Sequence, residues 1–422
     1  MTAALPLRRP GRRGTGRCVL VLLAVAVACG RARDPGLPPL RVGTSADYPP
    51  FSAVADGDLQ GLDVEIARRF AHDTGRRLEF VRLRWPDLRD DLAAGKYDVA
   101  MGGVTMRPER ALAGTFTRPV AATGAVVLVR RNVRATLADL DRPPVRMAVN
   151  AGGHLERVAR RLFPHASIVT TTDNVALPWL LESHAADALV TDDVEADVIA
   201  PQVGGSRRLG PLTHDRKAYL GADRTLIADL DAWLRAREAD GTLATLRARW
   251  LGPTRAGPRS AFASDLEALL ALTDLRLAFM PTVAAAKKEA GLPIDDPRQE
   301  ETILASVRAA APERQLDPDT AVAFFRAQIA AAGAVQRTFL ALPPAARPPV
   351  DRLDLVHQIR PALATLSEEI VARAADVASD PQALAALDPA VVSGALDASL
   401  VPAAHRDAIA IAVKGLRRTL RP

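Results

Sequence analysis

The chain has 422 residues, of which 48% are hydrophobic and 25% charged, so it is long enough for two or three domains with sizeable cores. The net charge of +6 is concentrated at the start, because five arginines before Cys29 leave only +1 for the remainder. A nearly neutral body argues against a nucleic-acid partner. The two cysteines, Cys18 and Cys29, lie in that same segment, which excludes disulfide and thiolate chemistry from the rest of the chain.

Nucleotide and metal sites have no support in the sequence. The chain contains no G-x-G-x-x-G loop and no Walker-type loop. It also lacks the paired His and Cys spacings that bind zinc. We therefore expect no metal and no organic cofactor.

The first residues have the pattern of an export signal. Arginines precede the apolar run Val19–Ala28, which has the length of a signal-peptide core and is too short to span a membrane. Cys29 follows this run, so two outcomes stay open: cleavage near Ala28, or a lipid anchor at Cys29. The sequence predicts a signal peptide over residues 1–28, a tether over 29–39, and a periplasmic location.

Residues 40–252 alternate short β-branched runs with helical patterns, which is typical of an α/β domain. The predicted strands include 41–44, 99–104, 125–129, 146–149 and 188–190, and the predicted helices include 61–74 and 153–162. The sequence therefore predicts a mixed or parallel sheet in this part of the chain.

The strand patterns end at the Pro- and Gly-rich stretch 253–260, which we expect to be a linker. Residues 261–415 are predicted to form an all-helical domain. Asp-Pro pairs mark its helix starts, because aspartate accepts hydrogen bonds from free amides and proline fits the first helical position. These pairs are Asp296-Pro297, Asp317-Pro318, Asp380-Pro381 and Asp388-Pro389.

Three motifs in the first domain resemble the amino-acid-binding periplasmic solute-binding proteins. They are RVGTSADYPPF from Arg41, GLDVEIARRF from Gly61 and GKYDVAMGGVTMRPER from Gly95. In that family two α/β lobes clasp the ligand, so the resemblance implies a two-lobed binding-protein fold of type II. A small carboxylate ligand needs a guanidinium fork and neighbouring donors, and the resemblance assigns these roles to Arg110, Thr105 and the Gly103 backbone.

A closer resemblance is to cyclohexadienyl dehydratases, enzymes built on the same scaffold. It rests on the stretches RWPDL from Arg84, VNAGG from Val149, TDDVEA from Thr191 and KAY from Lys217. A transport protein needs Asp192 to meet a ligand ammonium, but it does not need a second acid one helical turn later. The resemblance makes Glu195 the catalytic carboxyl, whereas an exposed glutamate in a first helical turn is the alternative.

The dehydration chemistry requires such a carboxyl. Prephenate loses carbon dioxide and a ring hydroxyl, and a positioned acid assists because hydroxide is a poor leaving group. A glutamate buried in an apolar cleft keeps its proton near neutral pH. The substrate-binding residues that the resemblance implies are Tyr48, Trp85, Gly103, Thr105, Arg110, Asn150, Asp192 and Lys217. For Trp85, core packing is the alternative.

The sequence departs from the family after Gly152 and Gly153. The family places a threonine and another polar residue there, whereas this chain has His154 and Leu155. A hydroxyl contact to the ligand is therefore lost. The His154 imidazole is predicted to lie at the surface, and contact with the substrate is the alternative.

The helical domain resembles the secreted gamma-type AroQ chorismate mutases over residues 260–380. Arg276 and Lys287 are eleven residues apart, which is about three helical turns and places them on one face, although Pro281 interrupts the helix between them. The resemblance implies that a set of cations and one amide converge on one pocket: Arg276, Lys287, Arg298, Gln336 and Arg360.

Chorismate rearranges without covalent help, so a mutase acts by positioning and charge. Fixed donors at the ether oxygen stabilise the transition state, and arginines that grip the two carboxylates hold the folded conformer. By resemblance, Lys287 and Gln336 address the ether oxygen. Some relatives have a glutamate at the place of Gln336, and that acid must be protonated to donate, whereas glutamine donates at any pH.

The two resemblances predict consecutive steps in one exported chain. The mutase makes prephenate from chorismate, and the dehydratase converts prephenate or arogenate to phenylpyruvate or phenylalanine. The alternative is a solute-binding domain without catalysis, fused to an active mutase. Expected partners are these small molecules, and a homodimer is an open possibility because mutases of this type are often dimeric.

Overall fold

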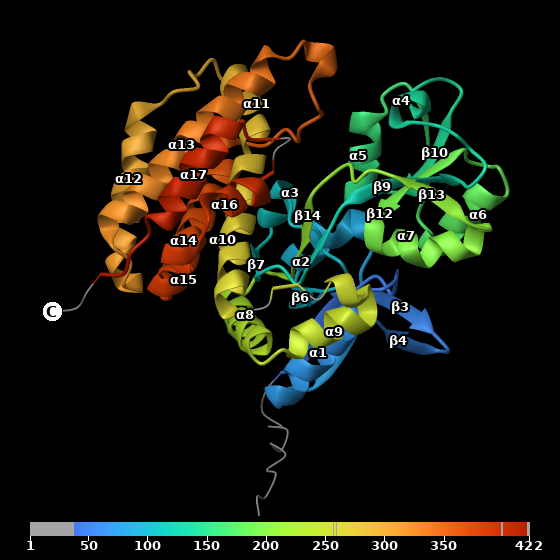
Figure 1. Cartoon of the computed structure of the whole chain (residues 1–422), viewed down its shortest axis with the longest axis horizontal. Helices are drawn as coiled ribbons and strands as arrows, with labels where there is room; N and C mark the ends of the chain where they lie inside the picture. Colours follow the sequence, from blue (N-terminus) through green and yellow to red (C-terminus); the bar gives the residue numbers. More distant parts are fainter. Residues whose placement is uncertain (1–37, 256, 259, 398–399, 420–422) are drawn as a thin grey trace, which may run out of the picture.

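The structure is a computed structural model that describes residues 38–255, 257–258, 260–397 and 400–419 (Figure 1). The predicted signal peptide, nearly all of the predicted tether, and Cys29 lie outside the described residues. Two bodies stand side by side in Figure 1, an α/β body that contains every described strand and a body of helices only. The predicted order, a two-lobed α/β domain followed by an all-helical domain, is confirmed.

The first lobe is built on a five-stranded sheet in the order β5-β1-β6-β15-β7. Strand β1 pairs in parallel with β5 and β6, and β15 is antiparallel to β6 and β7. A small antiparallel sheet of β2, β3 and β4 lies at its edge. The strands are β1 Leu40–Thr44, β2 Asp47–Tyr48, β3 Ser52–Ala55, β4 Asp58–Gln60, β5 Leu78–Arg82, β6 Val99–Ala100, β7 Thr115–Phe116 and β15 Leu220–Gly221. The helices are α1 Leu62–Asp73, α2 Leu88–Ala93, α3 Pro108–Ala111, α8 Arg224–Ala239 and α9 Thr242–Leu251.

The second lobe has a sheet in the order β11-β10-β12-β9-β13. Strand β10 is parallel to β11 and β12, and β9 is antiparallel to β12 and β13. The strands are β9 Ala125–Arg130, β10 Arg146–Asn150, β11 Ser167–Thr171, β12 Ala188–Asp192 and β13 Ser206–Leu209. The helices are α4 Leu137–Leu140, α5 His154–Leu162, α6 Leu177–Glu182 and α7 Asp193–Ile199.

Two crossing strands join the lobes. The chain leaves the first lobe through β8, Ala121–Thr123, and returns through β14, Asp215–Lys217, and these strands pair antiparallel. Because successive side chains of a strand point to opposite faces, β14 presents Asp215 and Lys217 on one face and Arg216 on the other. The two faces of this short strand therefore lie in different surroundings.

The helical body consists of long helices packed around one core. Its helices are α10 Ala261–Ala278, α11 Met280–Glu289, α12 Pro297–Ala310, α13 Pro318–Ala341, α14 Arg360–Ala378, α15 Pro381–Ala386, α16 Pro389–Ala395 and α17 Ala403–Lys414. The segment Ala261–Glu289 is apolar enough to cross a membrane, but 83% of its apolar window is buried inside the protein, as in the core helix of a globular domain. Short 3₁₀ and π turns complete the chain: η1 Trp85–Asp87, η2 Asn174–Ala176, η3 Ala200–Val203, η4 Pro253–Arg255, η5 Pro312–Arg314, η6 Pro344–Ala346 and η7 Leu355–Ile359.

The helix boundaries follow the capping chemistry expected from the sequence. At each of the four Asp-Pro pairs, the aspartate side chain accepts a hydrogen bond from a backbone amide in the first turn of α12, α13, α15 or α16. The expected interruption by Pro281 is also present, because α10 ends at Ala278 and α11 begins at Met280.

One predicted strand is too long. The apolar run 99–104 predicts a continuous strand, but β6 ends at Ala100. Gly102 and Gly103 have φ angles of +145° and +77°, which break the extended backbone. A Cβ atom on Gly103 would lie 2.5 Å from the ring of Tyr48, so only glycine fits this turn.

Buried ion pairs fasten the helical body to the first lobe. Arg118, only 1% exposed, donates to Asp231 of α8 at 2.9 Å and to Asp265 of α10 at 3.0 Å. Arg373 of α14 also donates to Asp231, at 2.6 Å. Figure 1 shows α10 at the border of the two bodies, beside α8 and α3. The two domains are therefore joined by a desolvated charge network as well as by the chain.

Replacing Arg118 with methionine should weaken this junction. The change leaves two buried carboxylates with less compensation, which typically costs about 3–5 kcal/mol. We expect urea unfolding to report a loss of that size. The matched control is Arg308→Met, which breaks the exposed pair with Asp319 and should cost less than about 1 kcal/mol. Equal losses for the two variants would contradict a stabilising role for the network.

Candidate active sites

All eight residues predicted to bind substrate in the first domain line one cleft between the lobes. Gly153, His154 and Leu155 complete its wall. The first lobe, the second lobe and strand β14 all contribute side chains. The free volume is about 20 Å³, far below the roughly 300 Å³ of ordinary ligand sites. The lobes are therefore closed on each other, and a ring-bearing ligand requires them to part.

Asp63 shapes the cleft floor, although sequence reasoning did not single it out. Its carboxylate is 1% exposed and accepts hydrogen bonds from the Gly103 amide at 2.6 Å and the Tyr219 hydroxyl at 2.9 Å. Burial raises the pKa of Asp63 to about 6, against the lowering effect of these bonds. An acid in the otherwise apolar face of α1 was the signal available in the sequence.

Arg110 and the aromatic residues form the wall on the side of the first lobe. Arg110 is held by a bond from its Nη1 to the Thr105 carbonyl oxygen at 2.8 Å, and its guanidinium lies 5.5 Å from the centre of the Trp85 ring. Tyr48 packs edge-on against Trp85 at 5.9 Å. Burial lowers the pKa of Arg110 to about 10, so it stays charged at neutral pH. The indole N–H of Trp85 and the amide oxygen of Asn150 are buried and have no hydrogen-bond partner in the described part of the chain, so both are available to a ligand.

Lys217 occupies the centre of the cleft. Its ammonium donates to Asp192 at 2.7 Å, to Thr105 at 2.9 Å and to the Tyr48 hydroxyl at 3.4 Å. Both members of the ion pair are nearly inaccessible, with side chains 2% and 1% exposed. The charge of Asp192 is therefore already matched by an internal cation.

Glu195 lies behind this ion pair rather than on the cleft wall. Its side chain is buried, 3% exposed, at the start of α7, and it accepts a hydrogen bond from the Thr191 hydroxyl. Burial, followed by the nearby charge of Asp192, raises the pKa of Glu195 to about 8 against the opposing effects of Thr191 and Lys217. At pH 7 the carboxyl therefore carries a proton. The exposed alternative for Glu195 is wrong.

The prediction that His154 lies at the surface is also wrong. Its ring is 6% exposed, and Nε2 lies 2.7 Å from the carboxylate of Asp215 on β14. Burial alone would raise the pKa of Asp215. The contacts with His154, Lys217 and Thr213 outweigh this effect and hold the pKa of Asp215 below its ordinary value. The partner of His154 is 61 residues away in the chain, so local sequence gave no signal for this pair.

In the helical domain, Arg276 and Gln336 form the buried part of the predicted mutase site. Arg276 is 4% exposed, and its Nε and Nη1 atoms have no partner among the described residues. Burial alone lowers the pKa of Arg276 to about 10. Gln336, 6% exposed, donates to Met280 and to the Ala332 carbonyl, and its side-chain oxygen is unpartnered. Buried groups without partners are expensive unless a ligand satisfies them.

Lys287 is also buried, 9% exposed, whereas Arg298 and Arg360 lie toward the exterior. Lys287 donates to the Ile294 carbonyl at 2.5 Å, and desolvation lowers its pKa. The charges of Asp296 and Arg360 also act on Lys287, and Arg360 lies 3.7 Å from Asp296. Arg298 is exposed, and within the described residues no hydrogen bond or ion pair engages its guanidinium. The structure thus joins Lys287 with Arg360 through Asp296 and leaves Arg298 apart.

Comparisons with known proteins match each domain separately. Residues 40–253 match the bacterial extracellular solute-binding proteins, family 3, and residues 267–337 match chorismate mutase type II. The cyclohexadienyl dehydratase of Pseudomonas aeruginosa is 33% identical over 220 residues, covering 50% of this chain and 82% of that protein. The L-cystine-binding protein TcyJ of Escherichia coli is 24% identical over 219 residues, covering 50% and 82%.

Among solved structures, an ancestral amino-acid-binding protein described as a precursor of cyclohexadienyl dehydratase is 32% identical, covering 50% of this chain and 95% of its own, with a TM-score of 0.48. The matched family covers half of the chain, and the matched dehydratase is covered over most of its length. The chain therefore belongs to the bacterial extracellular solute-binding proteins of family 3, with a chorismate mutase type II segment in its helical domain.

Proposed function

We propose that this chain is a bifunctional enzyme of phenylalanine biosynthesis. The helical domain converts chorismate to prephenate, and the cleft domain converts prephenate, or arogenate, to phenylpyruvate or phenylalanine. The likeness to a cyclohexadienyl dehydratase over most of that enzyme's length supports the second step, and the chorismate mutase match supports the first. The proposed units are a signal peptide at 1–28, a tether at 29–39, the cleft domain at 40–252, a linker at 253–260 and the mutase domain at 261–415.

The observation that carries the dehydratase proposal is the burial of the Glu195 carboxyl, which is 3% exposed and lies one helical turn after Asp192. As the bond to the carboxylate carbon breaks, its electron pair moves into the ring and expels the ring hydroxyl. Glu195 does not line the closed cleft, so the lobes must part before the ring hydroxyl reaches its carboxyl. The departing hydroxide then takes the Glu195 proton and leaves as water, so the products are carbon dioxide, water and an aromatic 2-oxo acid. A carboxyl with a pKa of about 8 is suited to this role because it holds its proton at neutral pH.

Lys217 argues against a simple amino-acid receptor. A receptor for amino acids needs an unmatched acid to meet the ligand ammonium, and Asp192 is the acid in the expected place. Here the Lys217 ammonium lies 2.7 Å from Asp192 and takes the place that a ligand ammonium would occupy. The cleft therefore favours a ligand whose charges are carboxylates, with Arg110, Thr105 and Asn150 as their contacts.

The mutase proposal rests on the buried guanidinium of Arg276, which lies 5.9 Å from the centre of the Phe325 ring and whose Nε and Nη1 atoms have no hydrogen-bond partner among the described residues. Such a group is stabilised when a substrate carboxylate binds it, because the charge is then compensated in a low-dielectric site. Gln336 and Lys287 would donate to the ether oxygen as the carbon–oxygen bond breaks. Arg360 would bind the second carboxylate. Arg298, exposed in the absence of ligand, would have to turn inward to complete the site.

The family places the protein outside the cytoplasm, in the periplasm or the extracellular space. Export by the N-terminal signal, with either cleavage near Ala28 or lipid attachment to Cys29, is the finer proposal. A homodimer is a further proposal that light scattering would test.

The Glu195→Gln variant tests the dehydratase half. Glutamine keeps the size of the side chain but supplies no acidic proton, so the kcat for prephenate should fall by about 100-fold or more. Chorismate conversion to prephenate should be unchanged. The measurement feeds chorismate to the purified chain and follows prephenate and phenylpyruvate together. If the wild-type chain stops at prephenate, the first domain is a binding module and the dehydratase proposal is wrong.

The pH dependence tests the same carboxyl independently. Since the protonated form of Glu195 is the active one and its pKa is about 8, the kcat for prephenate should be steady below that pH. Above it, kcat should fall by about tenfold per pH unit as the proton is lost. Steady-state rates with saturating prephenate provide the profile. A kcat that rises with pH through 8 would mean that the ionised carboxylate is the active form.

The mutase should show little pH dependence. Gln336 does not titrate, so kcat/KM for chorismate should vary less than about twofold between about pH 5 and about pH 8. In Gln336→Glu the activity should fall as pH rises, because an ionised carboxylate repels the developing negative charge. The measurement is kcat/KM for chorismate in the wild-type chain and in Gln336→Glu across this pH range. A steep loss in the wild-type chain would argue against Gln336 as the donor.

A further inference from the structure

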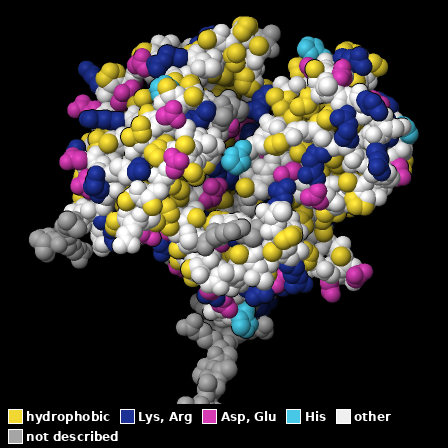
Figure 2. Space-filling model, in the orientation of Figure 1, with side chains coloured by type: hydrophobic (Ala, Val, Ile, Leu, Met, Phe, Trp, Pro, Cys, Tyr) yellow, Lys and Arg dark blue, Asp and Glu magenta, His cyan; other side chains and the backbone are white. Residues whose placement is uncertain are grey.

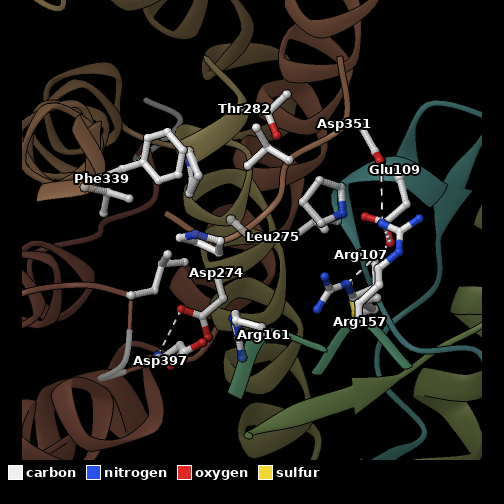
Figure 3. Close-up of a pocket in the computed structure, with 18 of the residues that line it drawn as sticks. Arg107, Glu109, Arg157, Arg161, Asp274, Leu275, Thr282, Phe339, Asp351 and Asp397 are labelled. Carbon is white, nitrogen blue, oxygen red and sulfur yellow. Dashed lines mark hydrogen bonds and ion pairs between the residues drawn. The ribbon is translucent and has the colours of Figure 1, made fainter. Parts of the chain in front are cut away.

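A second hollow lies between the two domains, outside both proposed active sites. Its volume is about 440 Å³, which is within the range of small-molecule binding sites. Figure 2 shows the surface hollowed where the helical domain faces the α/β domain, and Figure 3 shows the lining side chains. Both lobes, strand β14 and the helical domain contribute to the lining.

The two walls of this hollow differ in chemistry. The helical wall is largely apolar, because Leu275 and Ala278 of α10 and Val335 and Phe339 of α13 face it at helical spacing. The opposite wall carries four arginines from the α/β domain, namely Arg107, Arg157, Arg161 and Arg216. A site with an apolar face opposite guanidinium groups suits a ring that bears a carboxylate.

The arginines are unequally matched by acids. Arg157 contacts Glu109 at 2.8 Å and Asp351 at 3.5 Å. The buried Nε of Arg107 forms an ion pair with Glu109 at 3.5 Å but no hydrogen bond among the described residues.

Arg161 has no hydrogen bond or ion pair among the described residues. Desolvation, then the charge of Arg107, lowers the pKa of Arg161. The charges of Asp397 and Asp215 act on Arg161 in the opposite sense, but neither acid makes a hydrogen bond or ion pair with it among the described residues.

Four of the acids that line the same hollow pair with side chains other than Arg161. Asp274 accepts from Arg216, Asp215 from His154, and Glu109 and Asp351 from Arg157. Asp397 donates through its backbone to Asp274. The cation left for a ligand is therefore Arg161, with Arg107 beside it.

We propose that this interdomain hollow is a third binding site, specific for a small ring-bearing carboxylate. The carboxylate lies between Arg161 and Arg107, and the ring packs on Leu275 and Phe339. Arginine forks favour carboxylates, and their contacts gain strength in a partly desolvated site. The ligand chemistry is shared by the product of the mutase and the product of the dehydratase.

The site also touches both catalytic regions. Leu275 and Val335 line it, and each directly precedes a proposed mutase residue, Arg276 or Gln336. Asp215 and Arg216 line it as well, and Lys217 follows them on β14. A ligand here contacts the backbone that positions both sets of residues, so its binding is linked to theirs. This coupling rests on the proposed function, whereas the binding site itself does not.

Binding is tested in the full chain with the other two carboxylate sites disabled. The parent protein carries Arg110→Gln and Arg276→Gln, and the probes are phenylpyruvate and prephenate, followed by calorimetry. We expect binding of one molecule per chain to persist in the parent and to weaken by about tenfold or more when Arg161→Gln is added. The matched control is Arg160→Gln, on the same helix and paired with Glu156, which should leave binding unchanged.

A second variant tests the binding site without changing its charge. Ala278→Phe fills the apolar side of the hollow without altering any arginine, and it should also weaken binding. Tighter binding of prephenate would identify the intermediate as the occupant, and tighter binding of phenylpyruvate would identify the end product. Absence of binding in the parent, or equal binding with and without Arg161→Gln, would overturn the proposal.

The coupling has its own readout in the otherwise unaltered chain. Added phenylpyruvate should change the mutase rate in a manner not overcome by chorismate, and Arg161→Gln should abolish this effect. If the ligand binds but neither rate responds, the third site exists without regulatory coupling. If the chain has no dehydratase activity, the calorimetric result still stands, so failure of the proposed function and failure of the third site are distinguishable.

Discussion

The buried ion pair between Lys217 and Asp192 governs the chemistry of the first domain. Both charges are removed from water, which is tolerable only because they lie 2.7 Å apart and Thr105, Thr123 and Tyr48 complete the hydrogen bonding. The pair uses the acid that an amino-acid receptor would keep for its ligand. The charge of Asp192 also acts on Glu195, which stays neutral because ionising it would place another negative charge in a desolvated site.

Strand β14 connects this chemistry to the rest of the protein. Its alternation directs Lys217 into the cleft, Asp215 toward His154, and Arg216 to the helical domain. There Arg216 donates to Glu267, Asp274 and the Ala395 carbonyl. The same strand is one of the two crossings between the lobes. Closure of the lobes around a substrate and contact with the helical domain therefore both involve these three consecutive residues. The fusion of the two domains thus links their structures and does more than supply one domain with the product of the other.

The sequence predicts the local features of this molecule well. Aspartate caps, the interruption at Pro281 and the alternation of strands and helices depend on neighbours in the chain, and all are present in the structure. The order of domains also follows from the change of pattern after residue 252. The eight cleft residues are gathered in one pocket, because the motifs that contain them lie at the lobe edges, although their contacts with substrate stay predictions.

The features that the sequence could not predict are contacts between residues far apart in the chain. His154 can be buried because its ring pairs with the Asp215 carboxylate. Arg118 can be buried because Asp231 and Asp265 form ion pairs with it. The strand at 99–104 ends early because Tyr48 packs against a left-handed glycine. In the mutase region, spacing predicts a shared helix face but not that Arg298 lies exposed, since that depends on how α12 packs.

The central claim is that Glu195 is a neutral acid in a closed cleft, and its protonation state can be measured directly. Infrared difference spectra between the wild-type chain and Glu195→Gln at pH 7 separate the carbonyl band of a protonated carboxyl from the bands of a carboxylate. The account predicts a carbonyl band that disappears as the pH is raised through about 8. A carboxylate signal from Glu195 already present at pH 6 would contradict it.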